Sequence, residues 1–271
     1  MNDLVVLLVV LLSMTFQIVS HEFGHWLVAR LFGMWTPVFS VFGLGPRKYS
    51  IILGRFWNTE LRISPIPIGG YVPVPEVTGH TDEDLARPVK FGNEVHQLQR
   101  FPIWKRALVA LAGPAMNFIV GFLTLTVLIA VVLKMSPGAA LWEGAKASVG
   151  VIWAMIVALG GMLHLVAPTP GVSGGVHTVV GISRYAAAAY QASTIKFFLV
   201  MSSISFSLGV FNLLPIPLLD GGQLLFMLIE KLRGKAMRLV TQRRIKRVFV
   251  YVLGAIFVIG LVNDFLHPLG H

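Results

Sequence analysis

The sequence predicts an α-helical polytopic membrane protein. Of its 271 residues, 55% are hydrophobic and only 13% are charged, and the mean hydropathy is +0.76. Soluble domains carry about 25% charged residues, so this chain is too apolar to belong to that class. Its apolar residues gather in runs of the length that crosses a bilayer, roughly 20 residues. We expect four transmembrane helices, a small membrane-associated β-sheet or hairpin between the first two, and an interfacial or re-entrant helix before the third.

Four apolar runs are long enough to span the membrane, and they occupy residues 4–31, 107–133, 197–219 and 248–266. The first run follows Met1-Asn2-Asp3 without a basic segment, and no small-residue cleavage site ends it. We therefore expect this run to be a retained span and not a signal peptide. The chain has no cysteine, which excludes disulfides and thiolate metal ligands.

The basic residues predict the orientation of the spans. Residues 30–106 carry ten Lys or Arg, and residues 231–247 carry eight. Because loops rich in Lys and Arg face the cytoplasm, both termini should lie outside. The two basic stretches lie on the same side only if two spans separate them. A fifth apolar run, residues 149–166, should therefore lie along the outer interface or re-enter, and a genuine fifth crossing is the alternative. The net charge of +10 does not predict a nucleic-acid partner, because the basic residues lie beside apolar segments, where lipid headgroups are the expected contacts.

These observations divide the chain into seven expected segments. They are a first span over residues 1–31, a cytoplasmic-side membrane-associated β-rich loop over 32–103, a second span over 104–134, an outer loop with the interfacial or re-entrant helix over 135–193, a third span over 194–222, a basic cytoplasmic segment over 223–247, and a fourth span with the C-terminus over 248–271.

The loop between the first two spans has the alternating pattern of β-strands. Residues 38–42 and 60–63 are short runs of this kind, bounded by glycines. The proline-rich stretch 65–74 is compatible only with an edge strand or a hairpin rim. Such an edge could pair with an extended substrate, or the sheet could only plug the membrane face. The polar residues 78–99 predict a solvated loop, with His80 and His96 at its surface.

The first apolar run contains the segment His21-Glu22-Phe23-Gly24-His25, which has the HExxH pattern of zinc proteases. On a helix, residues four apart share a face, so His21 and His25 can bind one metal ion while Glu22 acts on a water. Ionisable side chains inside a membrane span are costly, and three within five residues need a common explanation. The segment therefore predicts a metal site at membrane depth.

Asp220 is the candidate for the third ligand. It follows Pro215 and Pro217, which break the helix of the third span and leave backbone groups that are tolerated only in a protein interior or a wet cavity. The predicted topology brings Asp220 to the same depth and cytoplasmic side as the two histidines. The alternative is that Asp220 caps a helix over residues 223–232.

Together these motifs resemble the site-2 protease family of intramembrane zinc metalloproteases, in the bacterial branch that includes the regulator of sigma-E protease. The resemblance covers residues 14–222 and rests on four segments in the family's order, namely HEFGH, Gly69-Gly70-Tyr71, residues 112–118 and residues 212–222. It implies that His21, His25 and Asp220 bind Zn²⁺ and that Glu22 is the catalytic acid/base. It also implies substrate-binding roles for the residues Asn212, Asn117, Gly69, Gly70, Tyr71 and Val72.

The resemblance further implies a bacterial inner-membrane protease that cuts a transmembrane protein, such as an anti-sigma factor or a signal-peptide remnant, with its active site toward the cytoplasm. Asn117 could instead make an interhelical hydrogen bond. Many relatives carry a PDZ domain of about ninety residues between the second and third spans, and residues 134–193 are too few for one. His177 in that stretch is expected to be an interfacial structural residue, with a regulatory role as the alternative. The rival functions are a catalytically silent relative that binds membrane proteins and a metal or ion transporter.

Overall fold

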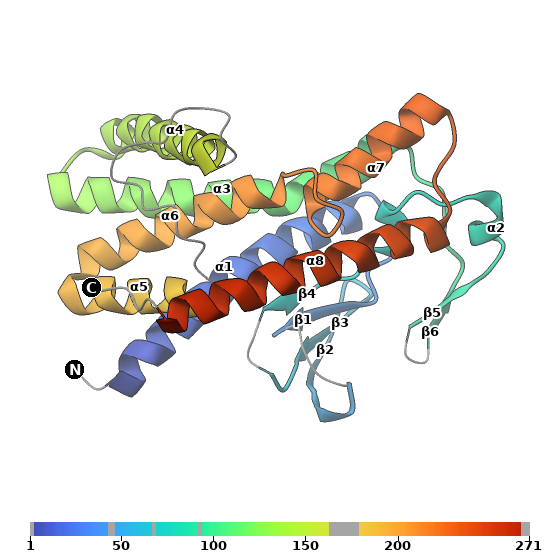
Figure 1. Ribbon diagram of the computed structural model, residues 1–271, viewed down its shortest axis with the longest axis horizontal. Helices are drawn as coiled ribbons and strands as arrows, with labels where there is room; N and C mark the ends of the chain where they lie inside the picture. The colour runs from blue at the N-terminus through green and yellow to red at the C-terminus, as the bar shows by residue number, and fades with distance from the viewer. Residues whose placement is uncertain (1–2, 43–46, 67–68, 92–93, 163–178, 267–271) are drawn as a thin grey trace. The chain divides into compact units, whose positions relative to one another are not determined.

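The computed structural model describes residues 3–42, 47–66, 69–91, 94–162 and 179–266 (Figure 1). The chain forms two compact units, and each is described by itself. The site unit comprises Thr15–Met116 and Phe211–Tyr251. The helical unit comprises Met1–Met14, Asn117–Val210 and Val252–His271.

Helices make up most of the described chain. They are α1 (Asp3–Leu31), α2 (Asp82–Leu85), α3 (Ile103–Leu133), α4 (Pro137–Met162), α5 (Val179–Ala192), α6 (Thr194–Asn212), α7 (Asp220–Arg233) and α8 (Leu239–Leu266). The strands are β1 (Val38–Val41), β2 (Ile51–Phe56), β3 (Thr59–Ile63), β4 (Gly70–Tyr71), β5 (Val89–Phe91) and β6 (Glu94–His96).

Four of the described helices are long and apolar enough to cross a membrane, which makes this an integral membrane protein. The candidate spans are Val5–Leu31, Ile103–Leu133, Pro137–Gly161 and Thr194–Asn212. The first, second and fourth of these correspond to predicted spans. The third lies in α4, which contains residues 149–162 of the apolar run and begins twelve residues before it. The length of α4 suits a crossing as well as an interfacial position. The interfacial or re-entrant helix therefore stays a prediction.

One expected boundary differs from the structure. The third span was expected to reach residue 219, but α6 ends at Asn212, because the two prolines that follow cannot continue a helix. Within the basic segment 223–247, residues 223–233 belong to α7 and residues 239–247 belong to α8.

The site unit contains a four-stranded sheet with the order β2-β3-β1-β4. Strands β1 and β3 are parallel, and β4 pairs antiparallel with β1 so that Tyr71 lies opposite Ser40. One face of the sheet packs against α1 through a buried cluster of Trp26, Phe39 and Val72. The small sheet expected between the first two spans is confirmed. Strands β1 and β3 fall on the runs 38–42 and 60–63, and the edge strand β4 falls within the proline-rich stretch 65–74. The strand β2 was not expected, and it is exposed along its whole length.

Residues 78–99 are more ordered than a solvated loop. Thr81 and Asp84 form a capping box at the start of α2, and β5 and β6 pair as a small antiparallel ladder. The surface position expected for His80 is wrong, because this residue is 8% exposed. His96 is half-buried and lies 3.3 Å from the buried carboxylate of Glu76.

The helical unit is held together by close helix packing. Its buried cluster joins Val10, Ala186, Phe197 and Met201. Two serines of α6 donate hydrogen bonds to main-chain carbonyls of α3: Ser205 to Asn117 at 2.8 Å, and Ser202 to Gly121 at 3.0 Å. Such contacts let neighbouring helices approach closely inside a membrane.

Candidate metal centre

The helix α1 brings His21 and His25 together. They lie one turn apart on the same face of the helix, and their Nε2 atoms are 3.1 Å from each other. Both residues are buried, at 9% exposed. Two buried imidazoles with facing nitrogens are the arrangement that the HExxH spacing predicts for metal ligands.

A main-chain carbonyl of α3 fixes the orientation of one imidazole. The Nδ1 atom of His25 lies 2.7 Å from the carbonyl oxygen of Val109. A carbonyl oxygen only accepts hydrogen bonds, so Nδ1 carries the hydrogen and Nε2 presents its lone pair. Metal-binding histidines characteristically donate their second ring N–H in this way.

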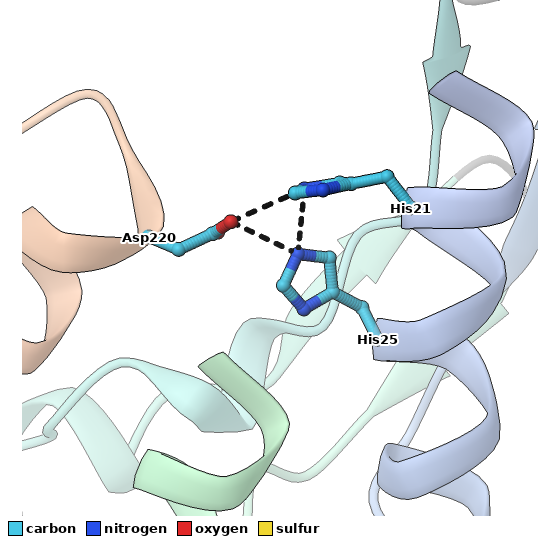
Figure 2. A group of neighbouring side chains, drawn as sticks. All are labelled: His21, His25 and Asp220. Carbon is cyan, nitrogen blue, oxygen red and sulfur yellow. Dashed lines mark hydrogen bonds and ion pairs between the residues drawn. The ribbon is translucent and has the colours of Figure 1, made fainter. Parts of the chain in front are cut away.

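Asp220 completes the group from the first turn of α7 (Figure 2). Its Oδ2 atom lies 3.1 Å from Nε2 of His21 and 3.3 Å from Nε2 of His25. The expected alternative, a capping role for Asp220, is wrong, because the N-cap of α7 is Leu219 and no side chain caps this helix. The carboxylate therefore points at the two imidazoles and not at the backbone of its own helix.

Two glycines in the first turn of α7 let the preceding loop pack closely against the helix and hold Asp220 in this position. A Cβ at Gly221 would lie 2.2 Å from the carbonyl oxygen of Leu213, and one at Gly222 would lie 2.1 Å from that of Ile216. The loop is closed by backbone hydrogen bonds from Ile216 to Leu214 and from Leu219 to Ile216. The proline-broken segment thus folds tightly against the start of α7.

The three ligand atoms fit a zinc ion. Tetrahedral zinc with bonds of about 2.0–2.1 Å separates its ligands by about 3.3–3.4 Å, and the observed separations are 3.1–3.3 Å. The buried Oδ2 atom of Asp220 has no hydrogen-bond donor, and the lone pair of His25 faces it. A cation between the three atoms would be held by the carboxylate and by the lone pairs of the two imidazoles.

Two glycines let α1 and α3 approach closely enough to build the site. A Cβ at Gly24 would lie 2.3 Å from the carbonyl oxygen of Ala112, and a Cβ at Gly113 would lie 2.3 Å from Nε2 of His25 and 2.7 Å from Nε2 of His21. Any side chain at 113 would therefore fill the space between the two ligand nitrogens. Gly113 forms the floor of the metal centre.

Glu22 lies beside the ligands and is held by the edge strand. The backbone N–H of Val72 donates to its Oε2 atom at 3.0 Å. A Cβ at Gly70 would lie 3.0 Å from Cγ of Glu22, so a glycine gives Glu22 room to reach the strand. Gly69 adopts φ +76°, a backbone conformation that favours glycine.

A polar cavity of about 360 Å³ opens at this centre. Most of the predicted site residues line it, namely His21, Glu22, His25, Tyr71, Val72, Asn212 and Asp220. Gly70 touches Glu22 from the strand. Asn117 belongs to the helical unit, where it is fully buried. His177 lies outside the described residues.

Three contributors to the site were missed from the sequence. They are Val109, which orients His25, and Gly24 and Gly113, which allow the helices to approach. Glycines within apolar helices are a signal of close helix packing, and both could have been found in that way. Val109 acts through its main-chain carbonyl, which every residue type has, so its role could not be predicted from the sequence.

Comparison with known proteins agrees with this geometry. Residues 9–259 match the model of Peptidase family M50, and the chain belongs to this family. The chain is 35% identical over 111 residues to zinc metalloprotease Rip1 of Mycolicibacterium smegmatis. It is 36% identical over 87 residues to the regulator of sigma E protease of Haemophilus influenzae.

The matched segments cover 41% and 32% of this chain but only 26% and 20% of those two relatives, so the chain spans about a quarter of their length or less. Over nearly its full length, 96%, it is 23% identical to Atu1380 of Agrobacterium fabrum, of which it covers 95%. Since relatives are named as zinc metalloproteases, zinc is the cofactor implied for the three-ligand centre.

Proposed function

We propose that this protein is an intramembrane zinc metalloprotease that hydrolyses peptide bonds within or near the transmembrane helices of single-span membrane proteins. One observation carries the proposal: His21, Glu22 and His25 lie on a helix apolar enough to cross a membrane, and the side chain of Asp220, from α7, converges with the two histidines on one point. Ionisable groups at that depth are costly and are a functional-site hypothesis by default.

The proposed chemistry assigns one role to each group. His21, His25 and Asp220 would hold the zinc ion, which when bound acts as a Lewis acid on the peptide carbonyl and acidifies water. Glu22 takes a proton from the attacking water as the new C–O bond forms. Glu22 then gives this proton to the leaving amine nitrogen as the C–N bond breaks. The products are a carboxylic acid and an amine.

The substrate would bind along the edge strand β4. A transmembrane helix hides its peptide groups in internal hydrogen bonds, so a scissile segment must unwind before it can be cut. The edge of β4 can accept an unwound segment as an extra strand, with Gly69, Gly70, Tyr71 and Val72 supplying main-chain contacts. Asn212 lines the same cavity and would hold the substrate from the other side. Substrates with helix-weakening residues should be preferred.

The proposed setting is a bacterial inner membrane. The charge distribution favours both termini outside and the active site toward the cytoplasm, with the segment boundaries given above. A relative is named for regulating sigma E, so an anti-sigma factor is a candidate substrate class, beside signal-peptide remnants. Asn117 remains a proposed substrate contact on the strength of the family resemblance alone.

Cleavage in defined membranes tests this proposal. The purified protein in liposomes should cut a co-reconstituted single-span reporter, lose this activity to a zinc chelator, and regain it when zinc is returned. Proline substitutions at residues 70, 71, 72 and 74 should each reduce cleavage while the protein stays folded. A zinc-loaded, folded protein that leaves a panel of single-span reporters uncut would instead favour the catalytically silent relative, and zinc flux across the liposome membrane would favour the transporter.

A further inference from the structure

The catalytic carboxylate and the substrate-binding strand share one hydrogen bond. The N–H of Val72 donates to Oε2 of Glu22 at 3.0 Å. The same N–H is among the groups that a paired substrate strand would use. The Val72 N–H therefore contacts the catalytic carboxylate and also belongs to the surface that would bind the substrate.

The packing of α1 on β4 explains why Glu22 reaches this donor. Ile18 and Glu22 approach Gly70 within 3.6 Å and 3.0 Å of the position its Cβ would take, and Trp26 packs against Val72. These three α1 residues are spaced four apart and lie on one helix face. The absence of a side chain at Gly70 opens the path for the carboxylate of Glu22.

Val72 directly follows the last residue of β4, Tyr71. Pro73 and Pro75 have no N–H, so Val72 and Val74 are the backbone donors between residues 72 and 75. In the described sheet, β4 is the last strand and pairs only with β1. Glu22 thus occupies the first backbone donor after the end of the edge strand.

Resting on the proposed function above, we propose that the bond from Val72 to Glu22 is a latch that a substrate strand opens. A substrate that pairs with β4 places its own carbonyl on the Val72 N–H and displaces the carboxylate. The released Glu22 carboxylate is then available to the attacking water. Charge-assisted bonds of this kind are stronger than neutral ones, so the latch holds in the free protein. The further main-chain hydrogen bonds of a paired substrate strand offset the loss of this bond. Hydrolysis is thereby coupled to strand pairing.

Val72→Pro tests the latch, because it removes the donor. Two substrates are compared: a single-span reporter and a blocked, water-soluble dipeptide amide too short to lie along β4. The variant should hydrolyse the dipeptide about tenfold faster than the wild type, which corresponds to ~1.4 kcal/mol. It should cleave the reporter at least about tenfold more slowly, because the strand has lost its donor.

Val72→Ala is the matched control, since it shortens the side chain but keeps the N–H. It should change the rates for both substrates by the same factor. If Val72→Pro lowers both rates together, or gives no faster dipeptide hydrolysis than the wild type, the bond only orients Glu22 and the latch is overturned.

Amide exchange of Val72 provides a readout that does not depend on activity or on a folded proline variant. In the full-length zinc-loaded protein, Glu22→Ala should speed exchange of the Val72 amide about tenfold, and a saturating extended peptide should slow it again. Unchanged exchange in Glu22→Ala overturns the latch. A wild type with the expected exchange but no reporter cleavage overturns the proposed function instead, so the two failures are distinguishable.

Discussion

His25 donates its Nδ1 hydrogen to the main-chain carbonyl of Val109 at 2.7 Å. This bond joins the helix that carries the HExxH segment to the helix that forms the floor of the metal centre. It also sets the tautomer that leaves Nε2 of His25 facing Asp220. The candidate metal centre therefore depends on main-chain groups and close helix packing as well as on His21, His25 and Asp220.

Gly113→Ala should abolish high-affinity zinc binding. The new methyl group would lie 2.3 Å from Nε2 of His25, so an imidazole or a helix must move. We expect zinc affinity to fall by about 10–100-fold or more, the range for lost ligand orientation. Zinc content after dialysis measures this. Gly150→Ala, in a helix position with open space around it, is the control and should bind zinc normally. Normal zinc affinity in Gly113→Ala would contradict the claim that a side chain at this position fills the space between the two histidine nitrogens.

Asp220→Asn should weaken zinc binding more than the loss of a residue that only hydrogen-bonds to a metal ligand. The amide keeps the shape of the side chain but removes the negative charge of the third ligand. Affinity should fall by more than the roughly 10–100-fold typical of outer-shell changes, as competition with a chromophoric chelator would measure. Asp82→Asn serves as the control, since its side chain is 95% exposed. Equal affinity in both variants would remove Asp220 from the ligand set.

Glu230→Ala should destabilise the site unit. Arg106 donates to Glu230 at 2.6 Å, and the arginine side chain is only 4% exposed. Removing one partner of a buried pair leaves an uncompensated charge, at a cost of about 3 kcal/mol. Denaturant titration in detergent should show this loss in the free energy of unfolding. The exposed pair of Arg100 and Asp82 is the comparison, and Asp82→Ala should cost at most ~1 kcal/mol. Equal costs would contradict the burial argument.

Acid should destabilise the protein through His80. Burial lowers the pKa of His80 below its ordinary value of 6.5, although the nearby Asp84 opposes this. The unfolded chain then binds the proton more readily, so the His80 contribution to stability is complete above pH 6.5 and is lost as pH falls below it. Unfolding measured from pH 7.5 to 5.5 should show this decline. His80→Gln should flatten it, and an unchanged pH profile in that variant would refute the assignment.

The convergence of His21, His25 and Asp220 could be predicted from the sequence because the signals of these residues are local. Two histidines four residues apart share a helix face in any helix, and the prolines before Asp220 break the third span wherever it packs. The edge strand was likewise marked by its prolines. These features do not depend on how distant parts of the chain meet.

The remaining features depend on tertiary contacts. His80 stands in a polar stretch, yet it is buried. Strand β2 escaped prediction because its apolar residues do not alternate with polar ones, and all six of its residues are exposed. Gly24 and Gly113 acquire their roles only when α1 and α3 meet. A single sequence therefore predicts reactive side chains better than it predicts the main-chain contacts that position them.

Glu22→Gln in liposomes tests the central claim most directly. The amide keeps the size of the side chain and can still accept the hydrogen bond from Val72, but it cannot take a proton from water. We predict that zinc stays bound at the wild-type ratio and that cleavage of the single-span reporter falls by about 10²–10⁴-fold, the usual contribution of a general acid–base. Cleavage at the wild-type rate with zinc bound would contradict the account.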